Sequence, residues 1–72
     1  MRILITGSNG LLGQKIVSQL FRSDSVFLAT SIGENRNQDC SMEFYTPMDI
    51  CNATEIADVF AAFKPTHVIH TA

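Results

Sequence analysis

The sequence TGSNGLLG at residues 6–13 holds three of the chain's four glycines, at positions 7, 10 and 13. It follows the apolar run Ile3-Leu4-Ile5, and runs of this kind suit a strand buried on both faces of a parallel sheet. Behind it, apolar residues recur at helical spacing over residues 11–22. A glycine-rich turn between a buried strand and an amphipathic helix therefore decides the fold.

Each glycine has its own steric role in such a turn. Gly7 lets the chain turn sharply at the carboxyl end of the strand, Gly10 lets the backbone approach a pyrophosphate, and Gly13 lets the helix lie tightly on the strand. The free amides near residues 9–12 and the helix dipole then face an anion. The alternative is a turn that merely connects strand to helix. The context favours dinucleotide binding, with contacts from Gly7, Ser8, Asn9, Gly10, Leu11, Leu12 and Gly13.

The rest of the chain continues the alternation of strands and helices. Further strands are predicted over residues 26–29, 43–46 and 67–70, with a polar loop over residues 31–42. Asn52 and Glu55 form a variant capping box that opens a second helix, which ends before Pro65. Parallel strands joined by right-handed crossovers then give a Rossmann-type α/β sheet with flanking helices and the strand order 3-2-1-4.

Composition excludes several classes of protein. The chain has 72 residues, 46% of them hydrophobic, and a net charge of −2, so it forms at most one small domain and offers no basic surface for nucleic acid. No apolar stretch could span a membrane or serve as a signal peptide. Cys40 and Cys51 are eleven residues apart without a CxxC pair, so we expect free thiols, no metal site and a cytoplasmic location.

The spacing of the glycines carries a family resemblance. TGxxGxxG differs from the ordinary GxGxxG and resembles the cofactor fingerprint of the extended short-chain dehydrogenase/reductase superfamily. Met48-Asp49-Ile50 resembles that superfamily's D-[ILV] motif, and the final stretch KPTHVIHTA resembles its fourth strand. Together with ITGSNGLLGQ, these stretches look most similar to the dTDP-4-dehydrorhamnose reductase family.

The resemblance implies an oxidoreductase that acts on a nucleotide-linked sugar. The expected reaction of the whole enzyme is reduction of dTDP-4-dehydro-L-rhamnose to dTDP-L-rhamnose. The alternatives are another nucleotide-sugar epimerase, dehydratase or reductase, or a regulatory subunit that binds the dinucleotide without catalysis. The family's catalytic Ser or Thr, Tyr and Lys come later than residue 72, so residues 1–72 would be the N-terminal part of an NAD(P)-binding domain and inactive alone.

Further cofactor contacts follow from the same resemblance. The family's motif implies that Asp49 accepts a hydrogen bond from the adenine amino group, beside Ile50, while Thr71 and Ala72 pass beneath a ribose. Asp49 has a second interpretation, as a helix-entry residue whose carboxylate binds free amides just before Asn52. Both interpretations stay open at this point.

The end of the second strand bears on the choice between NAD and NADP. Relatives that prefer NAD place an acidic residue there, whereas this chain has Thr30 and Ser31, which do not repel a 2′-phosphate. Arg36 lies six residues beyond Thr30 and could bind that phosphate, although it could equally be a solvated loop residue. We therefore predict NADPH, with NADH as the alternative.

No catalytic residue is expected within the chain. Tyr45 is followed four residues later by Asp49 rather than by lysine, so it does not match the family's Tyr-x-x-x-Lys pair. His70, at the carboxyl end of the last strand, is expected to be buried and hydrogen-bonded rather than catalytic. That strand, with Val68 and Ile69, should form an exposed sheet edge through which the chain self-associates.

Overall fold

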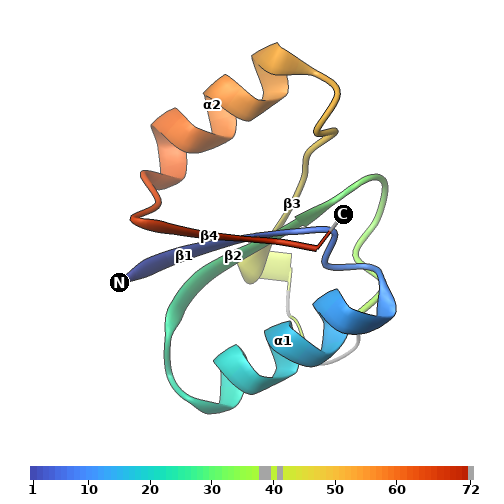
Figure 1. Ribbon diagram of the computed structural model, residues 1–72, viewed down its shortest axis with the longest axis vertical. Helices are drawn as coiled ribbons and strands as arrows, with labels where there is room; N and C mark the ends of the chain where they lie inside the picture. The colour runs from blue at the N-terminus through green and yellow to red at the C-terminus, as the bar shows by residue number, and fades with distance from the viewer. Residues whose placement is uncertain (38–39, 41, 72) are drawn as a thin grey trace.

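The computed structural model describes residues 1–37, 40 and 42–71 (Figure 1). Within these described residues, four strands, two α-helices and one short 3₁₀ helix follow one another. In order they are β1 (Arg2–Thr6), α1 (Leu11–Arg22), β2 (Val26–Ser31), η1 (Met42–Phe44), β3 (Tyr45–Pro47), α2 (Ala53–Phe63) and β4 (His67–His70).

The strands form one parallel sheet in the order β3-β2-β1-β4, which confirms the predicted Rossmann-type topology. β1 lies in the middle and pairs Leu4 with Leu28 of β2 on one side and with Val68 of β4 on the other. α1 covers one face of the sheet and α2 the other (Figure 1). The carboxyl ends of the strands therefore meet along one edge, where the glycine turn also lies.

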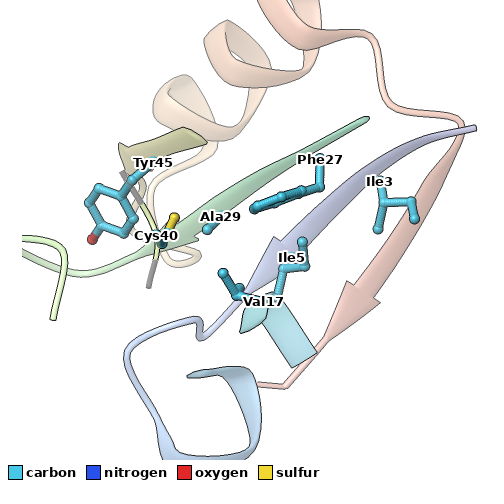
Figure 2. Close-up of a cluster of buried hydrophobic side chains, with 7 residues drawn as sticks. All are labelled: Ile3, Ile5, Val17, Phe27, Ala29, Cys40 and Tyr45. Atoms are coloured by element: carbon cyan, nitrogen blue, oxygen red, sulfur yellow. The ribbon is translucent and has the colours of Figure 1, made fainter. Parts of the chain in front are cut away.

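The apolar run in β1 feeds two separate core clusters because successive side chains point to opposite faces of the sheet. Ile3 and Ile5 pack with Val17 of α1 and Phe27 of β2 on the first face (Figure 2). Leu4 lies on the second face and packs with Met48 and with Val59 of α2. Leu4 and Ile5 are both fully buried, which explains why this strand is apolar throughout instead of alternating.

Local side-chain chemistry sets the bounds of α2. Asn52 accepts hydrogen bonds from the backbone N–H groups of Thr54 and Glu55, as the capping pattern predicts. Glu55 completes the cap differently from a standard capping box, since its carboxylate accepts from the Asn52 side chain and from the Asp49 N–H. At the other end, Lys64 takes a left-handed conformation with φ 54° before Pro65.

The third strand departs from its predicted range. The sequence predicts extended backbone over residues 43–46, but Glu43 and Phe44 belong to η1, and β3 begins at Tyr45 and includes Pro47. The Phe44 ring stacks on Phe27 at 5.2 Å and meets Phe21 edge-on, so packing against the α1-side cluster overrides the local strand pattern. Pro47 is tolerated because β3 is an edge strand, where one side needs no backbone donor.

Among the described residues, no helix has the length and apolar character needed to cross a membrane. Within that same part of the chain, no group of three or more His, Cys, Asp or Glu side chains could hold a metal ion. Neither cysteine forms a disulfide, and Cys40 is buried whereas Cys51 is exposed.

Candidate functional site

The site begins where β1 ends in a tight turn. Gly7 has φ +70°, a left-handed conformation that glycine adopts without strain, so the predicted sharp turn is present. The Gly10 N–H donates to the Gly7 carbonyl at 3.1 Å and closes the turn. The Ser8 N–H donates to the Thr30 carbonyl at 3.0 Å, which fastens the turn to β2.

The turn leads directly into α1, and the backbone amides at the N-terminus of this helix are not capped by a side chain. Gly10 is the N-cap residue and supplies no side-chain hydrogen bond, and the first turn of the helix contains no acidic residue. The first intrahelical bond is from the Gln14 N–H to the Gly10 carbonyl at 2.9 Å. The preceding amides, with the positive end of the helix dipole, are thus available to an anion such as a pyrophosphate.

Gly10 and Gly13 have different reasons to be glycine. A Cβ on Gly13 would lie 2.2 Å from the Gly7 carbonyl oxygen and 2.8 Å from the Ser8 Cα, so the fold itself requires glycine there. A Cβ on Gly10 would meet only the Gly7 oxygen, at 3.4 Å, which is an ordinary contact. Packing within the chain therefore does not require glycine at position 10. The missing side chain of Gly10 instead fits a ligand that approaches the turn from outside.

A small cleft of about 120 Å³ lies beside the turn, at the carboxyl ends of β1, β2 and β3. Gly7 forms one wall, and apolar side chains from the segments after β2 and β3 form much of the rest. The lining residues are Gly7, Ser31, Ile32, Met48 and Ile50. Ile32 and Ile50 are both exposed, and two apolar side chains at the rim of a cleft suit the faces of a flat aromatic ring.

Two predicted contact residues are buried by the fold. Thr30 is 0% exposed and its hydroxyl donates to the Ile5 carbonyl at 2.6 Å, while Ser8 is 1% exposed. The Ser8 Oγ has no hydrogen-bond partner among the described residues, and the Ser8 amide is already engaged by β2. Neither side chain is accessible to a ligand, so Ser31 is the residue at the end of β2 that reaches the cleft.

Asp49 follows the cleft residue Met48 and leads into α2. Its Oδ1 accepts from the Cys51 N–H at 2.9 Å, and its carbonyl accepts from the Asn52 N–H at 2.9 Å. This is the helix-entry geometry that the sequence left as one of two interpretations. Asp49 is half-buried beside Ile50. The adenine contact expected at this position remains a prediction.

The loop after β2 is held against the glycine turn by Asn9. The Asn9 Nδ2 donates to the Glu34 carbonyl at 2.8 Å and to the Ile32 carbonyl at 3.3 Å. Its Oδ1 accepts from the Arg36 N–H at 2.8 Å. The structure thus brings the backbone of Arg36 to the glycine turn, with an exposed side chain, although 27 positions separate Asn9 from Arg36 in the sequence.

Tyr45 holds the same loop from the side of β3. Its hydroxyl lies 2.8 Å from the Gly33 carbonyl oxygen and 3.2 Å from that of Ser31, and can donate to either. Burial raises the pKa of the Tyr45 phenol, and a hydrogen bond with Asn9 partly offsets that rise. Tyr45 therefore anchors the loop after β2 to β3 through its hydroxyl.

The end of β4 contacts the turn from its other side. The Thr71 hydroxyl donates to the carbonyl oxygens of Thr6 and Gly7, at 2.6 and 3.1 Å. Thr6 Oγ1 and His70 Nδ1 share a hydrogen bond at 2.5 Å. His70 is thus hydrogen-bonded as expected but exposed rather than buried, because β4 has a neighbour on one side only. Ala72, also predicted as a contact, lies outside the described residues.

Several residues that build the site were not recognised as such in the sequence. Ile32, Met48 and Tyr45 were given no role there. Asn9 was predicted as a cofactor contact, which stays a prediction, and the bonds of its side chain to the loop were not foreseen. The apolar pair Ile32 and Met48 directly follows the ends of two strands, and this position was the available signal for them.

The comparisons with known proteins agree with this geometry. The sequence model of the RmlD substrate binding domain matches residues 1–72. The chain belongs to this family. The resemblance to the extended short-chain dehydrogenase/reductase superfamily is thereby confirmed. No curated protein matches the chain significantly.

Three solved structures share the fold over nearly the whole chain. The UDP-glucose 4-epimerase of Thermus thermophilus, in complex with NAD, superimposes with a TM-score of 0.86 and 26% identity over 100% of this chain. The Bordetella bronchiseptica enzyme WbmG, in complex with NAD and UDP, gives 0.79 and 26% over 97%. The L-threonine dehydrogenase of Clostridium difficile gives 0.86 and 22% over 99%, a likeness of fold alone.

The chain spans about a quarter of the length of each of these structures. The matched share is 24% of the epimerase and of WbmG and 23% of the threonine dehydrogenase. The similarity therefore concerns the strand-turn-helix region described above and its continuation to β4. Two of these structures, the epimerase and WbmG, were determined in complex with NAD.

Proposed function

We propose that the chain is the dinucleotide-binding part of a nucleotide-sugar oxidoreductase that prefers NADPH. The whole enzyme would reduce dTDP-4-dehydro-L-rhamnose to dTDP-L-rhamnose. The observation that carries the proposal is the glycine turn, which combines uncapped amides at the start of α1 with a Gly10 that intrachain packing does not require. In this proposal the bound dinucleotide supplies the hydride, and residues 1–72 bind and orient it.

The residues present fit such a cofactor along its length. The amides of residues 11–13 would hold the pyrophosphate, since no side chain caps them. Ile32 and Ile50 would enclose the adenine ring in the cleft, with Asp49 at its edge. Thr71 would lie beneath the ribose, where its hydroxyl is held in place by the hydrogen bond to the Gly7 carbonyl. The proton donor of the family's reaction, a Tyr paired with a Lys, has no counterpart in this sequence.

The preference for NADPH rests on the segment after β2. Ser31 ends that strand where NAD-preferring relatives have a carboxylate, and it lines the cleft. Arg36 is exposed and its backbone is fixed at the glycine turn, from which its guanidinium could reach a 2′-phosphate. A guanidinium binds phosphate bidentately and keeps its charge at all working pH values.

Calorimetric titration of the folded chain with NADPH and NADH tests the proposal. We expect both to bind, NADPH about tenfold more tightly, because one charge-assisted contact is worth roughly that factor. Arg36→Ala should remove the preference and leave NADH binding unchanged. Gly10→Ala should weaken both cofactors alike, since its methyl group would occupy the approach to the turn. A folded chain that binds neither dinucleotide contradicts the proposal.

A second candidate is an NAD-using enzyme that acts on another nucleotide-linked sugar. It is favoured by the 26% identity to the epimerase and to WbmG, whose structures hold NAD and, in WbmG, UDP. The same titration separates the two candidates. Equal or tighter binding of NADH, unaffected by Arg36→Ala, would favour this second assignment.

A further inference from the structure

Asn9 links two segments that are far apart in the sequence. It stands inside the glycine turn, between Ser8 and Gly10, yet its side chain points at the backbone of residues 32–36. The orientation of its amide is set by its partners, because a carbonyl can accept only from the NH₂ group and an N–H can donate only to the oxygen. One side chain therefore satisfies two carbonyls and one amide of the loop.

These bonds fix the loop at the point where selection between cofactors would take place. The Arg36 N–H lies 2.8 Å from Asn9 Oδ1, so the start of the arginine side chain is held beside the turn that would bind the pyrophosphate. The Ile32 carbonyl, at the rim of the cleft, is held by the same amide. Without these bonds, the loop would have to be ordered during binding, at the expense of affinity.

We propose that Asn9 is a positioning residue for cofactor selection, which holds the loop of residues 32–36 against the glycine turn and thereby places Arg36 at the 2′-phosphate of NADPH. The inference rests on the proposed function and adds to it the residue through which Arg36 acts. Asn9 itself need not touch the cofactor with its side chain, since three of its bonds go to the loop backbone and it is also hydrogen-bonded to Tyr45, which holds the same loop.

A role in stability alone predicts a different outcome. If Asn9 only stabilised the fold, its removal would reduce the binding of NADPH and NADH by the same factor. If Asn9 positions Arg36, only the ligand that carries the 2′-phosphate loses affinity. The ratio of the two dissociation constants is therefore the decisive measurement.

The test is a double-mutant cycle on the full chain with Asn9→Ala, Arg36→Ala and the double variant, each titrated with NADPH and NADH. Asn9→Ala should lower the preference for NADPH about fivefold to tenfold, the scale of a displaced charge-assisted contact. In the Arg36→Ala background the same substitution should leave the ratio unchanged. Circular dichroism confirms that each variant is folded, and Asn9→Ser replaces Asn9→Ala in the cycle if the latter fails to fold.

Asn35→Ala is the matched control within the same loop. The Asn35 side chain donates to the Cys40 carbonyl and accepts from the Asn37 N–H, so its described bonds go to the segment just after the loop and do not reach the turn. We expect its cofactor ratio to equal that of the wild type. Amide hydrogen exchange without cofactor gives a second readout, because Asn9→Ala should accelerate exchange at Arg36 while Asn35→Ala should not.

The outcomes separate the inference from the proposed function. Normal binding with an unchanged ratio in Asn9→Ala overturns the inference and leaves the proposed function standing. Failure of the folded wild type to bind either dinucleotide overturns the proposed function and the selection role with it. Unchanged exchange at Arg36 in Asn9→Ala shows that the loop does not depend on Asn9 and overturns the inference by an independent route.

Discussion

Gly10 and Gly13 lie three residues apart in one turn, yet the fold makes very different demands on them. The space for a Cβ at Gly13 is occupied by backbone atoms of Gly7 and Ser8, which cannot move aside as a flexible side chain could. At Gly10 the same Cβ would be accommodated, and φ of −75° suits any residue. One glycine therefore serves the packing of α1 on β1, and the other fits an external ligand.

This contrast predicts unequal effects of the same substitution. Gly13→Ala should lower the free energy of unfolding by at least about 2 kcal/mol, because α1 must shift away from the turn. Gly10→Ala should lower it by less than about 1 kcal/mol, the usual difference between glycine and alanine at an N-cap. Urea denaturation followed by circular dichroism measures both. Equal losses in the two variants would contradict the assignment of separate roles.

For single residues, the roles that depend on local geometry could be predicted from the sequence. Side-chain hydrogen bonds to backbone groups far away in the sequence could not. The roles of Gly7 and Gly13 follow from steric rules that apply within a few residues. The bonds of Asn9, Tyr45 and Thr71 join segments 12 to 65 residues apart, and no periodic pattern marks them. Burial of Ser8 and Thr30 was missed for the same reason, since it depends on how turn and strands pack.

Among the elements, α2 shows how completely a short motif can define a helix end. Asn52 accepts from two backbone amides of the first turn and donates to the Glu55 carboxylate, which also accepts from the Asp49 N–H. The cap therefore fastens the helix to the segment that forms the cleft. The chemistry of the cap is local, which is why the start of α2 could be predicted. The start of β3 could not, because the packing of Phe44 on Phe27 places Phe44 in η1 instead of in the strand.

Removal of this cap should destabilise the chain measurably. Asn52→Ala should lower the free energy of unfolding by about 1 kcal/mol, because two helix N–H groups lose their acceptor. Asn52→Ser is the control, since serine retains an acceptor at the same position and should recover most of the loss. Thermal or urea unfolding gives both values, and an alanine variant as stable as the serine variant would contradict this role of the side chain.

The two edges of the sheet are protected unequally. β3 has three residues and includes Pro47, which lacks a backbone donor, so it offers little to another strand. β4 has four residues, pairs with β1 on one side, and includes Val68, whose side chain is 48% exposed. The neighbouring His67 and His70 are also exposed. An edge of this kind can pair with a second copy of the chain.

We predict that the chain self-associates through β4 as its concentration rises, because pairing would satisfy the free backbone groups of that edge and cover Val68. Sedimentation velocity over a concentration series measures the effect. Val68→Lys places a charge on the edge and should shift the chain toward the monomer, while Met42→Lys, an equal change on the exposed side chain next to β3, should not. A wild-type chain that stays monomeric at the highest concentration would show that the edge is not adhesive, and association abolished equally by both variants would place the contact elsewhere.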